Sequence, residues 1–265
     1  MKHTLKPLFS LILLAFISTS LFAQFDLQKP LPTDPNVKIG KLPNGLTYYI
    51  EKNAKPEKKM ELRLVVNAGS ILEDPDQQGL AHFMEHMSFN GSKHFPKNEL
   101  VDYLQKVGVK FGADLNAYTS FDETVYILPI STDDPDIVEK GFTVLEDWAG
   151  NNLLDKTEID KERGVVLEES RLSKGAQQRM LRQYFPKLFN GSRYATRLPI
   201  GKDSILKTFK PATLERFYKQ WYRPDLMAVI VVGDIDPALA LNEIKKHFSG
   251  FKNPVAEKPR PAITP

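Results

Sequence analysis

Six consecutive apolar residues, Met227 to Val232, restrict the possible folds of this chain more than any other segment. The run is rich in β-branched side chains and has no polar position, which is typical of a strand buried in the middle of a sheet. Such a strand needs a neighbour on each side. Strand-like runs that can supply these neighbours lie at 46–50, 62–66 and 122–130.

Segments with apolar residues at helical spacing alternate with the strands. The segment 137–148 is entered through Asp133-Asp134-Pro135, a typical helix start, and 156–172 is long and charged. Strands in pairs interleaved with helices predict a mixed α/β or α+β domain. The remaining predicted helices span 79–88, 96–107, 212–221 and 237–248.

The composition limits the kinds of site that the chain can build. Hydrophobic residues make up 42% of the 265 positions, enough for a core that needs no disulfides, and cysteine is absent. Any metal site must therefore use His, Asp and Glu. Residues 24–265 carry 34 basic and 33 acidic side chains, a net charge of +1, so charge gives no reason to expect a nucleic-acid partner.

The N-terminal segment has the pattern of an export signal. Lys2 and Lys6 precede an apolar run of about ten residues and then small residues before Ala23-Gln24. The run is shorter than the about 20 helical residues that span a bilayer, although an uncleaved anchor remains an alternative. We therefore expect a cleaved signal peptide at 1–23, no stable membrane span after cleavage, and a periplasmic or secreted protein.

Two proline-rich segments flank the expected domain. Residues 24–36 form a polar, extended leader, and residues 252–265 have the composition of a stiff linker or C-terminal tail that does not pack. The domain itself is expected to span 37–251. A linker at this position suggests that a further segment follows it.

The most specific chemical signal is His82-Phe83-Met84-Glu85-His86. On a helix, residues four apart lie on one face about 6 Å apart, so His82 and His86 can share one cation. Glu85 lies on the same surface, where it can take a proton from a water that zinc activates. His94 and His247 have no second histidine four residues away and are expected to be ordinary surface residues.

Two histidines leave a catalytic zinc site one protein ligand short. The acidic candidates lie in the predicted helix 156–172. Glu162 and Glu169 are seven residues apart and share a face, whereas Glu168 points roughly 100° away from Glu169 and is expected to be solvated. Glu158 is the remaining candidate.

The segment 79–92, which contains the two histidines, resembles the zinc-binding segment of the insulinase/pitrilysin family of metallopeptidases, the inverzincins. The segment 162–170 resembles the family segment that completes the zinc site. By this resemblance Glu169 is the third ligand and Glu162 an auxiliary carboxylate. Glu162 stays a rival ligand, because its spacing of 76 residues from His86 is nearer the family's usual gap than the 83 residues to Glu169.

A third segment, 115–119, resembles the strand edge that pairs with bound peptide in this family. The resemblance implies main-chain contact between Asn116 and Ala117 and the substrate, although a plain strand and turn is an equal alternative. For the fold it implies one α+β domain, a mixed α/β sandwich whose mainly antiparallel sheet is covered by helices. Family enzymes close a chamber with a second, similar half, so a homologous domain or subunit is an expected partner.

These features together predict a zinc-dependent endopeptidase that binds one zinc ion per chain and cleaves unstructured peptides or proteins. Glu85 is the expected base, and Glu162 is the expected auxiliary carboxylate that supports the zinc site. The alternative is a non-catalytic or partner-dependent subunit of a peptidase-like complex, since only one half is present. A purely structural zinc site fits poorly because such sites close all four positions with protein ligands, usually cysteine.

Overall fold

The computed structural model describes residues 32–109 and 116–262 of the chain. The predicted signal peptide 1–23 and the leader as far as residue 31 lie outside the described residues. The described residues from Pro35 onward form one compact unit.

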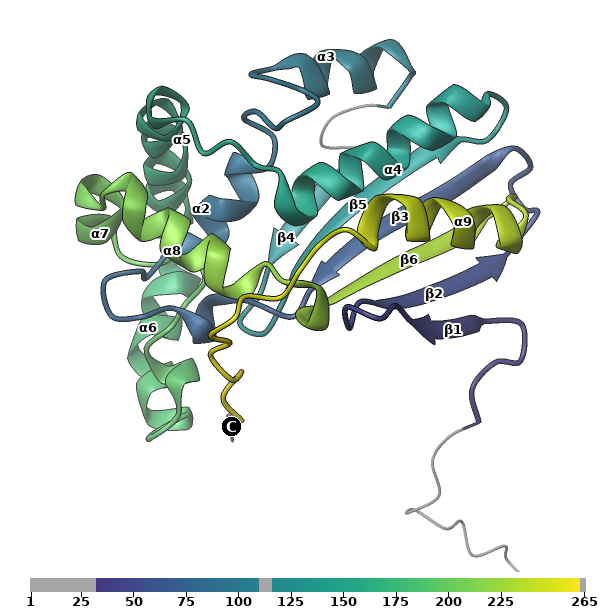
Figure 1. Cartoon of the computed structure of the whole chain (residues 1–265). Helices are drawn as coiled ribbons and strands as arrows, with labels where there is room; N and C mark the ends of the chain where they lie inside the picture. The colour runs from purple at the N-terminus through teal and green to yellow at the C-terminus, as the bar shows by residue number, and fades with distance from the viewer. Residues whose placement is uncertain (1–31, 110–115, 263–265) are drawn as a thin grey trace, which may run out of the picture. The chain divides into compact units, whose positions relative to one another are not determined.

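Six strands form a single sheet in the order β1-β2-β6-β3-β5-β4 (Figure 1). The β2–β6 pair is parallel and every other pair of neighbours is antiparallel, which confirms a mixed, mainly antiparallel sheet. Strand β6 lies between β2 and β3, as its apolar run predicts. The strands are β1 Lys38–Lys41, β2 Thr47–Lys52, β3 Lys59–Val66, β4 Asn116–Thr119, β5 Thr124–Ser131 and β6 Met227–Gly233.

Two helices, α4 and α9, lie across one face of the sheet (Figure 1). Alternate residues of β6 and β3 point at these helices and are buried, whereas the residues between them are half-buried on the other face. Asp134 and Asp236 begin α4 and α9, because each carboxylate accepts the N–H of the residue two positions on. Helix α4 spans Pro135–Gly150 and α9 spans Pro237–Phe248.

Most of the other helices gather at the end of the sheet near β4 (Figure 1). The predicted helices are present as α2 Leu80–Met87, α3 Glu99–Lys106, α5 Lys156–Ser173 and α8 Pro211–Trp221. The sequence patterns do not predict α6 Ala176–Leu188, α7 Asp203–Thr208 or β1. Helix α6 carries apolar residues at helical spacing, but Pro186 lies inside it, which is atypical of a helix interior. None of its residues is buried. Short 3-10 turns lie at Ser70–Leu72, Arg193–Ala195 and Pro224–Leu226.

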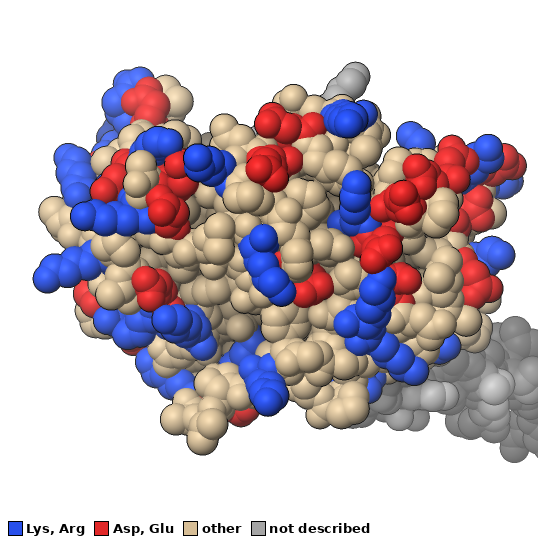
Figure 2. Space-filling view, turned by 45° about the horizontal axis from the view of Figure 1, so that its top comes forward, with Lys and Arg blue, Asp and Glu red and all other residues tan. Residues whose placement is uncertain are grey.

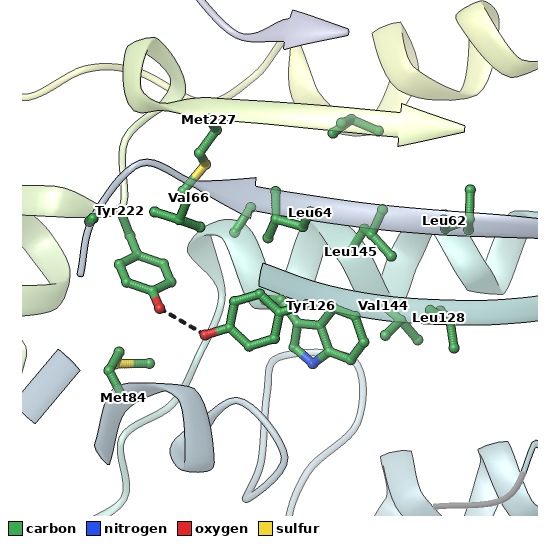
Figure 3. Packing of buried hydrophobic residues seen from close by; sticks show 14 of the residues in the cluster. Leu62, Leu64, Val66, Met84, Tyr126, Leu128, Val144, Leu145, Tyr222 and Met227 are labelled. Carbon is green, nitrogen blue, oxygen red and sulfur yellow. Dashed lines mark hydrogen bonds between the residues drawn. The ribbon is translucent and has the colours of Figure 1, made fainter. Parts of the chain in front are cut away.

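The C-terminal end of α2 is fixed by the buried core (Figure 3). The hydroxyls of Tyr126 on β5 and Tyr222 lie 2.7 Å apart, and Ser88, which follows α2, donates to Tyr126 at 3.0 Å. The indole of Trp148 stacks on Tyr126 and donates to the carbonyl of Ser88 at 3.0 Å. These contacts join α2 to the sheet and to α4.

The N-terminal end of α2 is fixed by a buried carboxylate. One oxygen of Glu73 accepts the N–H groups of Gly79 and Ala81, each at 2.9 Å. These groups are donors that the first turn of a helix cannot satisfy internally. Burial raises the pKa of Glu73 well above its usual value, against the lowering effect of these hydrogen bonds. Gly79 itself has φ +102° and packs directly against Gly201.

We expect Gly201→Ala to lower the free energy of unfolding by about 2–3 kcal/mol, because a methyl group has no room there. Residue 201 has φ +71°, and its Cβ would lie 2.3 Å from the Cα of Gly79. Gly191→Ala is the matched control, since Gly191 has φ +83° but nothing within 4 Å of the added atom. Urea unfolding of both variants measures the difference, and equal losses would contradict the close packing.

The segment 252–262 has no helix or strand, yet the expectation that it does not pack is wrong. Arg260 donates to the carbonyl of Asn67 at 3.1 Å and to the carboxylate of Asp122 at 3.1 Å. Lys258 lies 3.1 Å from Asp74. Charged side chains between the prolines therefore hold this segment against the domain, which proline content alone does not reveal.

The expectation that His247 lies on the surface is also wrong. Its side chain is 7% exposed, stacks on Phe142 and lies 2.6 Å from Glu146. His94 is partly exposed, but its Nδ1 lies 2.7 Å from the buried carboxylate of Asp147. Both histidines therefore contact α4 through acidic partners. Within residues 32–109 and 116–262, no helix combines the length and apolar character needed to cross a bilayer.

Candidate metal centre

Helices α2 and α5 pack against each other and bring three potential metal ligands together. His82 and His86 stand one turn apart on α2, with their Nε2 atoms 3.2 Å from each other. The carboxylate oxygens of Glu169 on α5 lie 3.6 Å from Nε2 of His82 and 3.4 Å from Nε2 of His86. Within the described residues this is the one group of three or more such side chains close enough to hold a metal ion.

The geometry of this group fits zinc. Two zinc ligands, each about 2.0–2.1 Å from the metal and separated by a tetrahedral angle, lie about 3.4 Å apart. The three separations in the group scatter around that value, between 3.2 and 3.6 Å. Two imidazoles and one carboxylate are also a donor set that catalytic zinc uses, with the fourth position left open.

Glu162 contacts the other side of His86. One of its oxygens lies 2.7 Å from Nδ1 of His86, and the other accepts the side-chain N–H of Asn90 at 2.7 Å. A carboxylate on Nδ1 orients the ring, and Nε2 of His86 faces His82 and Glu169. Both Glu162 oxygens are thus engaged away from the Nε2 atoms. Glu168 lies on the exposed side of α5, paired with Arg171.

The two histidines differ in their affinity for protons. Burial and the nearby charge of His86 lower the pKa of His82 to about 4, so His82 is neutral at pH 7. Burial alone would lower the pKa of His86, but the hydrogen bonds to Glu162 and Glu169 outweigh it and raise the pKa to about 9. Because a ligand must be deprotonated, metal binding at His86 competes with a proton.

Glu85 faces the same space from α2. Its carboxylate is almost fully buried, and Oε2 accepts a hydrogen bond from the hydroxyl of Thr119 at 2.7 Å. Burial raises the pKa of Glu85, and the hydrogen bond from Thr119 lowers it. Glu85 therefore lies beside the three candidate metal ligands but is not one of them.

Two clefts meet at the candidate site. One has a volume of about 570 Å³ and is lined by the three candidate ligands together with apolar side chains of α6. The other, of about 400 Å³, is lined by Glu162 and Asn116 among others. Glu85, His86 and Ala117 line both clefts. On the face shown in Figure 2, acidic and basic side chains are interspersed, with no large area of one sign.

Strand β4 lies at the end of the sheet and has β5 as its strand neighbour. Asn116 is exposed on it, and Ala117 is half-buried beside α2. The N–H of Ala117 donates to the side-chain oxygen of Asn116 at 2.9 Å, so it points away from β5. Among the described residues, no strand pairs with this edge beside the candidate metal centre.

The structure thus brings His82, Glu85, His86 and Glu169 to one point, with Glu162 behind His86 and with Asn116 and Ala117 at the nearest strand edge. Sequence reasoning did not single out Thr119, Asn90 or Glu73. Thr119 and Asn90 lie inside the segments that carry the family resemblance, so the sequence could have marked them as candidate site residues. Nothing in the local sequence marks Glu73.

A helix-borne pair of histidines, a carboxylate from a second helix and an adjacent glutamate on an α+β sheet define a metallopeptidase-like domain. Comparison with known families agrees: residues 48–196 match the model of the insulinase family (peptidase family M16), and residues 208–265 match the M16 inactive domain. The chain belongs to the insulinase family.

Among curated proteins, the chain is 43% identical over 227 residues to the probable zinc protease PqqL of Haemophilus influenzae, and 38% identical over 237 residues to that of Escherichia coli. These matches cover 86% and 89% of this chain but 24% and 26% of the relatives. The chain therefore spans about a quarter of the length of these relatives.

Two solved structures show the same fold. The first half of the periplasmic protease PqqL from Escherichia coli has a TM-score of 0.83 at 38% identity, covering 88% of this chain and 50% of that one. The ferredoxin protease FusC, solved as a mutant in complex with Arabidopsis ferredoxin, has a TM-score of 0.79 at 33% identity, covering 88% and 25%. The relatives' names support a zinc-dependent protease.

Proposed function

We propose that this chain carries the zinc-binding centre of an endopeptidase that hydrolyses unstructured peptides or proteins. The observation that carries the proposal is the group formed by His82, His86 and Glu169, whose ligand atoms all lie within 4.8 Å of one another. These three residues are the proposed ligands of one zinc ion. The buried carboxylate of Glu85 beside them is the proposed general base.

Zinc held by these side chains would supply Lewis-acid chemistry, polarising the peptide carbonyl and making water a stronger nucleophile at neutral pH. Glu85 accepts the proton that the attacking water loses and passes it to the departing amine. Glu162 keeps Nε2 of His86 turned to the site through its contact with Nδ1. The two clefts receive the side chains on either side of the cleaved bond.

The proposed substrate is an extended chain that adds to the sheet at β4. Strand addition uses main-chain hydrogen bonds, and the outward-facing N–H of Ala117 is one that a peptide carbonyl can take over from the side chain of Asn116. A folded segment has no free backbone to offer this edge. This geometry favours peptides and unstructured regions as substrates.

A second candidate is a half-enzyme that needs a further domain or subunit. The chain spans about a quarter of its curated relatives, and residues 208–265 match a domain described as inactive. A second homologous domain that closes the clefts is therefore a proposed partner. We also propose export to the periplasm, or secretion, with a cleaved signal peptide at 1–23; the PqqL structure from Escherichia coli is described as periplasmic.

We expect the purified chain without residues 1–23 to bind one zinc ion and to cut unstructured peptides of about 10–30 residues. Removing the metal with a chelator should abolish cleavage, and adding stoichiometric zinc should restore it, because these three ligands hold the ion. Mass spectrometry of a peptide pool identifies the cuts. Bound zinc without any cut would favour the partner-dependent half-enzyme, and cuts that persist in the metal-free protein would contradict the metallopeptidase.

A further inference from the structure

Strand β4 carries a side chain that controls the position of Glu85. We propose that Thr119 is a positioning residue: its hydroxyl holds the carboxylate of Glu85 in one orientation and links that carboxylate to the edge strand. The inference rests on the proposed role of Glu85 as the base. It adds a residue of the cleft lining that is not one of the proposed metal ligands.

The direction of the hydrogen bond follows from the neighbours of Thr119. Its Oγ1 lies 2.7 Å from Oε2 of Glu85 and 3.4 Å from Oγ1 of Thr124 on β5. The hydroxyl hydrogen of Thr124 is used by the carbonyl of Ala68, at 2.9 Å. A carboxylate oxygen accepts, so Thr119 donates to Glu85, and the longer contact with Thr124 is the weaker competitor for the same hydrogen.

This hydrogen bond fixes an otherwise free rotation. In the described part of the chain, Thr119 makes the only side-chain hydrogen bond to Glu85. The last torsion of a glutamate is broad and roughly two-fold, so packing alone leaves the plane of the carboxylate loosely defined. With Oε2 held by Thr119, Oε1 is the oxygen left to accept a proton in the cleft.

The same contact joins the base to the site of strand addition. Residues alternate across a strand, so Thr119 lies on the face of Ala117, toward α2, whereas Asn116 and Tyr118 are exposed on the other face. Ala117 lines both clefts with Glu85. A peptide that orders β4 by pairing with it therefore also orders the hydroxyl that holds Glu85.

Two substitutions separate the hydroxyl from the shape of the side chain. Thr119→Val keeps the volume, the β-branch and the strand preference but removes the donor. We expect it to lower kcat about 10–100-fold, with KM and zinc affinity within about twofold of the wild type. Thr119→Ser keeps the donor and should retain most of kcat. Thr143→Val on α4, where the hydroxyl bonds only its own helix, is the matched control and should change neither constant.

The experiment uses the same purified chain as the cleavage assay and adds a readout that does not depend on turnover. Crystal structures of the wild type and both Thr119 variants, in the metal-free state, should show the Glu85 carboxylate in one place when residue 119 is Thr or Ser. It should move or occupy two positions when residue 119 is Val. Zinc binding and thermal unfolding of each variant show whether the fold is kept.

The outcomes distinguish the positioning role from the proposed function. Thr119→Val with wild-type kcat and an unmoved Glu85 overturns the positioning role and leaves the base intact. Thr119→Ser as slow as Thr119→Val, with Glu85 in place in both, overturns it as well. If the wild type itself cleaves nothing but Glu85 moves only in Thr119→Val, the positioning role stands and the proposed activity of this chain on its own fails.

Discussion

Glu85→Gln should bind zinc as the wild type does and should lose about 10²–10⁴-fold in kcat. The glutamine side chain has the same shape, and its amide oxygen can still accept the hydroxyl of Thr119, which lies 2.7 Å away in the wild type. It cannot accept the proton of an attacking water. The variant therefore removes the proposed base while leaving the metal ligands and the packing of α2 unchanged.

Steady-state hydrolysis of one identified peptide measures kcat, and elemental analysis measures zinc per chain. Glu168→Gln is the matched control, because Glu168 is an exposed glutamate on α5 paired only with Arg171. It should retain normal turnover. A Glu85→Gln protein that cleaves at the wild-type rate would exclude Glu85 as the base, whereas loss of zinc would show that the residue acts through the metal.

Glu169→Gln should weaken zinc binding more than Glu162→Gln does. The oxygens of Glu169 lie 3.4–3.6 Å from the Nε2 atoms that a shared metal would join. Glu162 contacts Nδ1 of His86 at 2.7 Å, on the far side of the ring. Loss of a supporting residue costs about 10–100-fold in metal affinity, so Glu162→Gln should fall within that range and Glu169→Gln beyond it.

Competition for zinc with a chelator of known affinity measures both variants at one pH. The assay shows which of the two variants loses more zinc affinity, and by how much. Full zinc occupancy in Glu169→Gln together with loss in Glu162→Gln would reverse the assignment and make Glu162 the ligand, as its shorter spacing from His86 allows. Equal loss in both would mean that the two carboxylates act as one unit.

Periodicity predicts the parts of the fold that have a strong local pattern. The apolar run of β6 places it inside the sheet, and the motif of His82 and His86 lies on a helix as expected. Helix α6 has apolar residues at helical spacing, but it was missed because Pro186 within it argues against a helix. The contacts of residues 252–262 were missed because Arg260 and Lys258 bind acidic partners that lie far away in the sequence.

The candidate site also has features that the sequence predicts and features that depend on tertiary packing. Spacing alone puts Glu162 and Glu169 on one face of a helix, but it cannot say which of them faces Nε2 of His86. That distinction depends on how α5 crosses α2, and the crossing is set by tertiary packing. Predicting the contact of Thr119 also requires the tertiary packing, since its partner Glu85 is 34 residues away and on a different element.

Helix α2 is held at both ends by segments that are distant in the chain. Gly201 closes over its first turn, and Tyr222 reaches its last turn through Tyr126. The ligand from α5 comes 83 residues after His86. None of these neighbours is in place while the polypeptide is extended, so a newly made chain holds no assembled centre. Activity would therefore begin only once folding is complete, and metal binding would then favour the folded state by mass action.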